Sequence, residues 1–374
     1  MNAWLPESEQ IHHVRMQLLT LSNRVREHVT TDPLLVYAPS AAADAAAARV
    51  IRNLRGVRAS GVGGDALAQA GCNLNVPSLL LTRATLTPPR AALVCFAPEW
   101  MRSAGVALAM RGTRVLMYGG AEALTDLYAP VPARERIALA LTMPDEEAAW
   151  RQRGFDARYV GHPASEITRL SRADARGVLS LTAAAAAVAI SPGSRSHELR
   201  ANLPVMLAAF DDVRDRYGAV DARVLLAANL QRRDRAWAES AAAAAGIPTH
   251  TVHAEYGVGP LMSAFDVALC GPGTASLEAA LGGAAPVILV PSRGRMQRAL
   301  GTPQPVLSLP NRITSAPLFA EVERDELAAA NASERVLNVL DESAEFAHAT
   351  QRVAEALGEQ RPREVVATWL STWL

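Results

Sequence analysis

The sequence predicts an α/β protein made of two doubly wound parallel sheets, with a cleft between the two domains. Short apolar runs alternate with helical segments rich in Ala and Arg, a pattern typical of parallel strands joined by crossover helices. The alternation occurs twice, and a polar stretch over residues 162–185 separates the two series. At 374 residues the chain is long enough for two domains.

The expected elements follow the hydrophobic pattern along the chain. Apolar residues at three- and four-residue steps over 8–29 predict an amphipathic helix before the first domain. The expected strands are 34–38, 92–96, 114–118, 157–161, 187–191, 222–227, 266–270 and 286–290, and the expected helices between them include 42–55, 196–217 and 231–245. We therefore divide the chain into an N-terminal helix (1–30), a first domain (31–165), a second domain (166–345) and C-terminal helices packed back on the body (346–374).

Composition excludes several classes of protein. The formal net charge is zero, so no overall attraction to nucleic acid is expected. All 37 basic residues are Arg, which excludes a P-loop ATPase and a Schiff-base enzyme, since both require a lysine. Cys72, Cys95 and Cys270 are too widely spaced for a zinc site, and we expect neither a metal nor a cofactor.

Two junctions between a strand and a helix in the second half are suited to bind a polyanion. In SPGSRSHE (191–198), a Pro-Gly-Ser turn places Ser194 and Arg195 near the start of a helix, where N–H groups and a guanidinium favour phosphate. Glu198 then has two interpretations, a site residue or an ordinary acid in the first helical turn. In GPGTASLE (271–278), Gly273 and Thr274 precede the helix that carries Glu278; the alternatives are a nucleotide site or a turn that needs glycine for its geometry.

A third polar segment is SLPNRITSAPLFAEV (308–322), whose Asn311 and Glu321 are expected in a proline-rich loop. In doubly wound sheets, ligands bind beyond the carboxyl ends of the strands. Together the three segments favour a nucleotide site in the second domain.

These motifs resemble those of the lipid-A-disaccharide synthase family. YVGHP (159–163), SPGSRSHE, GTASLEAAL (273–281) and SLPN (308–311) occur in the family's order, and RASGVGGDALAQAGC (58–72) is similar to its Gly-rich N-terminal stretch. The resemblance implies the GT-B fold, with two Rossmann-like domains around an interdomain cleft. It also implies a metal-independent hexosyltransferase that moves an acylglucosamine unit from a UDP-sugar to a lipid-linked acceptor such as 2,3-diacylglucosamine 1-phosphate.

The resemblance assigns roles to the motif residues. Arg195 would hold the donor pyrophosphate, with Ser194 and Glu198 as further substrate-binding residues. Gly273, Thr274 and Glu278 would lie along the UDP and its sugar. Asn311 and Glu321 would close the donor site. The first half departs from the family: Phe96 stands where the family has its proposed catalytic Asp, and a phenyl ring cannot accept a proton.

Glu99 and Asp44 are the remaining candidates for the catalytic base, because both follow predicted first-domain strands. We rank Glu99 first, since it follows the same strand as Phe96, whereas Asp44 has the alternative of capping the helix after it. Several functions stay open: a transferase with a relocated base, a true disaccharide synthase, a non-catalytic UDP-sugar- or lipid-binding relative, and a GT-B sugar-nucleotide epimerase.

The sequence predicts a cytoplasmic protein. No stretch reaches the roughly 18 apolar residues of a membrane span. Arg293, Arg295 and Arg298 belong either to a solvated loop or to a peripheral contact with the inner face of the cytoplasmic membrane. For Trp369 and Trp373, packing on the body is expected, and a membrane-surface anchor is the alternative. The acceptor and the oligomeric state stay open.

Overall fold

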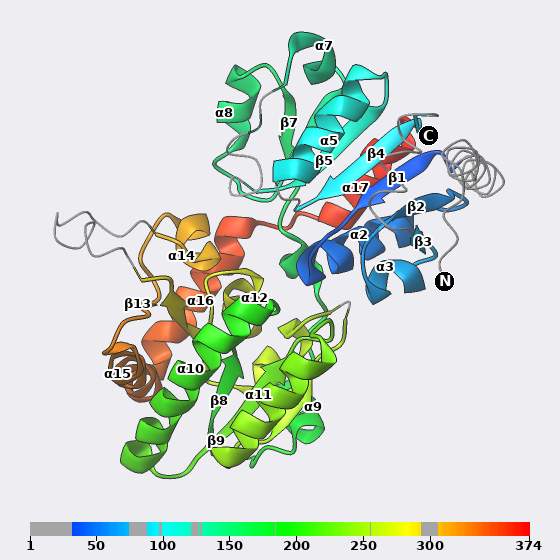
Figure 1. Ribbon diagram of the computed structural model, residues 1–374. Coiled ribbons are helices and arrows are strands. Elements are labelled where there is room, and N and C mark those ends of the chain that lie inside the picture. Colours follow the sequence, from blue (N-terminus) through cyan, green and yellow to red (C-terminus); the bar gives the residue numbers. More distant parts are fainter. Residues whose placement is uncertain are drawn as a thin grey trace, which may run out of the picture.

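The fold consists of two all-parallel sheets, each covered by helices (Figure 1). The computed structural model describes residues 32–74, 88–96, 99–120, 127, 129–183, 185–254, 256–292 and 306–374. The predicted helix over 8–29 and the loop with Arg293, Arg295 and Arg298 lie outside these residues. The GT-B class predicted from the sequence is confirmed by this architecture and by the structural comparisons described below.

The first sheet has seven strands in the order β3-β2-β1-β4-β5-β6-β7. Its strands are β1 (Leu34–Tyr37), β2 (Ala59–Val62), β3 (Asn73–Leu74), β4 (Ala91–Cys95), β5 (Arg114–Gly119), β6 (Ile137–Leu141) and β7 (Asp156–Tyr159). The helices between them are α2 (Ala41–Asn53), α3 (Asp65–Gln69), α5 (Glu99–Met110), α7 (Val131–Arg134) and α8 (Glu147–Gln152). Strands β1, β4 and β6 are buried throughout, as expected for a parallel sheet covered on both faces.

The second sheet has six strands in the order β10-β9-β8-β11-β12-β13. Its strands are β8 (Ala186–Ser191), β9 (Val220–Leu226), β10 (Thr249–Thr251), β11 (Val267–Cys270), β12 (Ala285–Val290) and β13 (Glu321–Glu323). Its helices are α9 (Arg172–Leu179), α10 (Ser196–Tyr217), α11 (Arg232–Ala244), α12 (Thr274–Gly282), α14 (Leu309–Thr314), α15 (Ala328–Asp341) and the 3-10 helix η2 (Gly259–Ala264). The strand order reverses between β8 and β11, which is where such sheets bind ligands.

The chain crosses between the domains twice. The 3-10 helix η1 (Pro163–Glu166) leads into the second domain, and α16 (Ser343–Leu357) is followed by α17 (Pro362–Ser371), which returns to the first domain. Figure 1 shows α17 beside the strands of the first sheet. Val366, Trp369 and Leu370 of α17 are buried in the first-domain core, and Arg158 stacks on the Trp369 ring at 4.5 Å.

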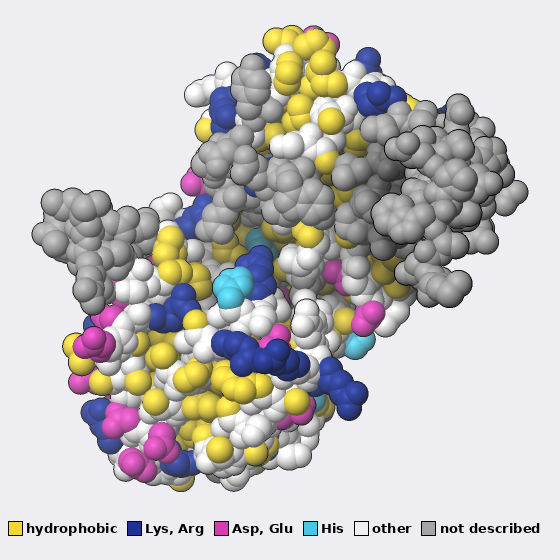
Figure 2. All heavy atoms as spheres, viewed as in Figure 1, with side chains coloured by type: hydrophobic (Ala, Val, Ile, Leu, Met, Phe, Trp, Pro, Cys, Tyr) yellow, Lys and Arg dark blue, Asp and Glu magenta, His cyan; other side chains and the backbone are white. Residues whose placement is uncertain are grey.

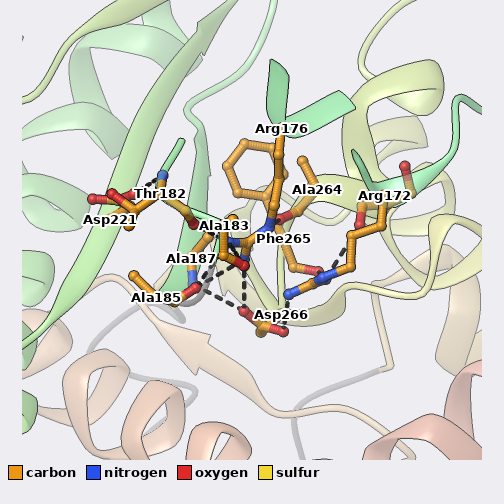
Figure 3. Close-up of polar contacts among 11 residues, drawn as sticks. Arg172, Arg176, Thr182, Ala183, Ala185, Ala187, Asp221, Ala264, Phe265 and Asp266 are labelled. Carbon is orange, nitrogen blue, oxygen red and sulfur yellow. Dashed lines mark hydrogen bonds and ion pairs between the residues drawn. The ribbon is translucent and has the colours of Figure 1, made fainter. Parts of the chain in front are cut away.

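The stretch predicted as a polar linker, 162–185, contains η1 and α9 instead of irregular chain. The sequence concealed this order because the anchor of α9 is a charged residue, Arg176, which is buried (Figure 3). Its Nε donates to the carbonyl of Ala264 at 3.0 Å, and both terminal nitrogens donate to the carbonyl of Ala185 at 2.9 Å. A further hydrogen bond reaches the carbonyl of Thr182. One guanidinium thus holds α9, η2 and the entry to β8 together.

The other differences concern short elements. Strands β2, β3, β6, β10 and β13 were not predicted, although β6 (IALAL) is a plain apolar run. The predicted proline-rich loop at 308–322 contains α14, with Pro310 at its second position, where proline is tolerated.

Replacing Arg176 by Met should destabilise the protein by at least about 2 kcal/mol, because a buried carbonyl without a donor costs about 1–3 kcal/mol. Urea unfolding measures the change. The matched control is Arg172→Met, which removes the half-exposed ion pair to Asp266 and hydrogen bonds of 3.2 and 3.3 Å to the carbonyls of Ser263 and Phe265. It should cost less than Arg176→Met, because water can replace contacts of a half-exposed side chain. Equal losses in the two variants would contradict the anchoring role of Arg176.

Candidate functional site

A cavity of about 350 Å³ lies at the carboxyl edge of the second sheet and faces the first domain. Its lining includes the loops after β8 and β11, the end of β13, and first-domain residues from α2 to η1. Figure 2 shows basic side chains and a histidine gathered where the two domains meet. The position matches the rule that open α/β sheets bind ligands at the reversal of strand order.

The loop after β8 gives this cavity its first anion-binding feature. Gly193 has φ +117°, and a Cβ there would lie 2.8 Å from the Cβ of Glu198, so the turn requires glycine. Arg195 occupies the N-cap position of α10 and makes no side-chain capping bond, which leaves the first N–H groups of the helix open to the cavity. The Arg195 guanidinium is bound by Glu198, at 2.7 Å between Nη1 and Oε1.

The loop after β11 provides the second feature. Gly273 is the N-cap of α12 and Thr274 its first residue, and this helix also begins without a side-chain cap. Two helix N-termini therefore face one cavity, and both favour negative charge through their free N–H groups and their dipoles. The sequence placed Ser194, Arg195, Glu198, Gly273, Thr274 and Glu278 at this site, and all of them line the cavity.

Two buried polar atoms beneath these loops have no hydrogen-bond partner among the described residues, Ser191 Oγ and Asn202 Oδ1. The Asn202 amide is oriented by its Nδ2, which donates to the carbonyl of Pro192 at 2.8 Å. Both residues line the cavity. Because buried polar groups almost always have partners, the pair is suited to bind a polar ligand.

Glu278 lies deeper on α12, with its carboxylate buried in the cavity wall. Its Oε2 accepts hydrogen bonds from the N–H groups of Val258 and Gly259, each at 3.0 Å, which ties α12 to the start of η2. Burial raises the pKa of Glu278 to about 7, while attraction to Arg49 and the two backbone hydrogen bonds oppose the rise. The carboxyl is thus poised between its two protonation states near neutral pH.

On the first-domain side, the cavity wall carries the rings of Phe96 and His162. Phe96 follows the last residue of β4 and lies in the left-handed region, with φ 42°, which is uncommon for a bulky residue. Its ring centroid lies 5.4 Å from that of Tyr118 and 6.2 Å from that of His162. Burial, assisted by Arg49, lowers the pKa of His162 to about 3, so the ring is neutral at physiological pH. Its Nδ1 accepts from the N–H of Ala164, which places the ring proton on Nε2.

Arg49 reaches from α2 to the interdomain connection, where its Nη1 donates to the carbonyl of Pro163 at 2.7 Å. The residue is buried and lines the cavity. It was missed from the sequence because it lies in an apparently ordinary Ala-rich helix. Two other lining residues were not predicted as site residues. His162 could have been found because it belongs to the YVGHP motif, whereas Arg324, three residues after Glu321, belongs to none of the quoted motifs.

Asp44, a candidate base, has the contacts of a cap. Its carboxylate accepts from the N–H groups of Gly64 at 2.8 Å, Ala66 at 3.0 Å and Leu67 at 3.1 Å, which begin α3. It does not line the cavity. The expected alternative was a cap on its own helix, but Ser40 caps α2, and Asp44 caps the neighbouring α3.

Three predicted site residues remain, Glu99, Asn311 and Glu321. The side chain of Glu99, at the first position of α5, is outside what the structure describes. Asn311 and Glu321 do not line the cavity and bind each other, with Asn311 Nδ2 donating to Glu321 Oε1 at 3.1 Å. Glu321 also accepts from the backbone of Leu307 and Ser308, so this pair holds α14 against β13.

Comparisons with known proteins identify the family. The lipid-A-disaccharide synthetase family model matches residues 135–368. The lipid-A-disaccharide synthase of Anaeromyxobacter sp. strain K is 31% identical over 284 residues, which cover 67% of this chain and 72% of that protein. The chain belongs to the lipid-A-disaccharide synthase family. The enzyme of Bordetella petrii is 30% identical over 282 residues, 64% of this chain and 70% of its own.

Solved structures support the fold of this family member. UDP-GlcNAc 2-epimerase from Neisseria meningitidis, bound to UDP-GlcNAc, has a TM-score of 0.64 at 12% identity, covering 91% of this chain and 99% of the epimerase. Spinosyn rhamnosyltransferase SpnG with thymidine diphosphate has a TM-score of 0.55 at 13% identity, covering 90% and 99%. At such low identity these likenesses concern the fold alone. The family membership and the GT-B fold together make the chain a glycosyltransferase relative.

The family match begins at residue 135, so the first five strands lie outside it. The difference from the family pattern noted in the sequence, Phe96, also lies in this first half of the chain. Among the residues that the structure describes, no helix combines the length and apolarity needed to cross a bilayer.

The raised pKa of Glu278 predicts a pH dependence of stability. A free glutamate titrates near 4.5, so between about pH 4.5 and 7 the folded protein keeps a proton that the unfolded chain has lost. The unfolding free energy should therefore fall as pH rises through this window, by up to about 1.4 kcal/mol per pH unit. The glutamine in Glu278→Gln does not titrate, so the unfolding free energy of this variant should lack the part of the decrease that comes from Glu278. Denaturant titrations of both proteins between pH 4.5 and 8 measure it, and parallel curves would show that Glu278 does not titrate there.

Proposed function

We propose that this protein transfers a glucosamine-type unit from a UDP-sugar to a lipid-linked acceptor such as 2,3-diacylglucosamine 1-phosphate. The observation that carries the proposal is the pair of uncapped helix N-termini, α10 and α12, facing one cavity in a member of this family. Such an arrangement favours a diphosphate.

In this proposal the donor diphosphate lies against the starts of α10 and α12. Arg195 exchanges its bond to Glu198 for a phosphate oxygen, and Ser194, Gly273 and Thr274 line the path of the UDP. Departure of UDP leaves negative charge on the diphosphate, and prearranged N–H groups with a guanidinium stabilise such charge. We propose that these groups act without a divalent ion. Glu278 lies along the nucleotide, while Asn311 and Glu321 support the site from α14 and β13.

The acceptor hydroxyl must lose a proton as it attacks the sugar. We propose Glu99 as the base, because it starts the helix that follows β4 and Phe96, whereas the Asp44 carboxylate already accepts three backbone hydrogen bonds. The second candidate function is a non-catalytic UDP-sugar-binding relative. It is favoured by the first-domain wall of the cavity, whose described residues include no carboxylate.

We further propose that the protein acts on the cytoplasmic side of the membrane. The lipid-linked acceptor then requires only peripheral contact with the inner membrane surface, to which Arg293, Arg295 and Arg298 would contribute by attraction to anionic lipid.

The Arg195→Ala variant should bind UDP more weakly by about 1.5–3 kcal/mol, the range for a hydrogen bond to a charged group. The Glu198→Gln variant should bind UDP more tightly, because it releases Arg195 from its ion pair and removes a nearby negative charge. Calorimetry without added magnesium measures both. Unchanged affinity in both variants would remove Arg195 from the proposed diphosphate site.

The Glu99→Gln variant should lose turnover by about 10²–10⁴-fold, the usual effect of a positioned acid–base group, with UDP affinity unchanged. Release of UDP from acylated UDP-glucosamine, with and without the lipid acceptor, provides the assay, and Asp44→Asn is the comparison variant. Normal turnover in Glu99→Gln would refute the assignment of the base. If the wild type binds UDP and transfers no sugar from any UDP-hexosamine, neutral or acidic, to a glucosamine-based lipid, the non-catalytic function is correct.

A further inference from the structure

Arg324 follows β13 at one end of the cavity. Its backbone N–H donates to the carbonyl of Val290 at 3.0 Å, which continues the pairing of β13 with β12. Its side chain lines the cavity together with Leu289 and Pro291. The proposed function gives this residue no role.

The charge of Arg324 has no counterpart among the described residues. Its Nε is buried without a hydrogen-bond partner, and no described carboxylate forms an ion pair with it. The other two arginines of the lining differ: Arg195 is paired with Glu198, and Arg49 attracts Glu278. The Arg324 side chain is half-buried, and shielding its Nε from water without a partner is unfavourable, so an anionic group beside Arg324 would be stabilised.

The strand order places this cation away from the diphosphate site. The strands run β8-β11-β12-β13, and neighbouring strands lie about 4.8 Å apart, so β13 ends roughly 10 Å beyond β11. On the opposite side of β8, the cavity is lined by apolar residues at the ends of β9 and β10, such as Leu225 and Val252, which suit a flat base. With the diphosphate between β8 and β11 and the base at the ends of β9 and β10, as this placement requires, the sugar would lie on the β13 side, toward Arg324.

We propose that the donor sugar carries a carboxylate and that Arg324 binds it. The inference rests on the proposed transfer from a UDP-sugar and changes its donor unit from a neutral glucosamine to a UDP-linked hexosamine with an acidic group, a hexosaminuronate. A guanidinium matches a carboxylate with two parallel hydrogen bonds, a geometry that an uncharged hydroxymethyl group cannot satisfy.

The test compares ligands that differ only at C6. The ligands are UDP-N-acetylglucosamine with UDP-N-acetylglucosaminuronate, the corresponding galacto-configured pair, and UDP alone as the reference. Calorimetry measures the affinity of each ligand for the wild type, for Arg324→Gln and for the control Arg335→Gln. The Arg335 side chain is exposed on α15. The wild type should bind one uronate roughly 10–150-fold more tightly than its neutral partner. Arg324→Gln should reduce this ratio to about one, with unchanged affinity for UDP and the neutral sugars, and Arg335→Gln should behave as the wild type.

The measurements distinguish a failure of this inference from a failure of the proposed function. Equal wild-type affinities within both pairs would overturn the inference and leave the proposed function standing, and this comparison needs no variant to fold. If Arg324→Gln weakens UDP as much as the uronate, Arg324 binds the diphosphate and the inference is wrong. Failure of the wild type to bind UDP or any UDP-sugar would refute the proposed function, and the inference with it.

Discussion

The reversal of strand order between β8 and β11 is the constraint on which the candidate site depends. Crossovers from these adjacent strands run in opposite directions, so α10 and α12 begin side by side with N–H groups that no side chain caps. The small residues of both loops, Gly193 above all, let the backbone turn tightly enough to expose these groups. The roles proposed for Ser194, Arg195, Gly273 and Thr274 follow from a diphosphate placed there.

A few contacts fix the positions of the two domains around this crevice, and of these only the packing of Trp369 was expected from the sequence. Trp369 of α17 is buried in the first-domain core, and Arg49 of α2 binds the carbonyl of Pro163 in the connection. An ion pair of 3.9 Å between Arg312 of α14 and Glu146 of the first domain adds a third link. These contacts hold the first-domain wall that carries Phe96 and His162 against the cavity at the second sheet.

The fold and the second-domain part of the cavity lining were predictable because their signals are local. An apolar run followed by small residues and a helix marks the end of a strand. The sequence therefore predicted Arg195 and Thr274 at such ends, and both line the cavity. Arg49 and Arg324 were missed because nothing near them in the sequence distinguishes a cavity-lining arginine from a surface one. The capping bonds of Asp44 to α3 join segments about 20 residues apart in the chain, and only the packed structure shows them.

The most direct test of this account is a crystal structure of the protein with UDP. The account predicts the diphosphate between β8 and β11, with phosphate oxygens about 2.7–3.2 Å from backbone nitrogens at the starts of α10 and α12. A diphosphate bound instead at the corresponding crevice of the first sheet, between β1 and β4, would contradict it.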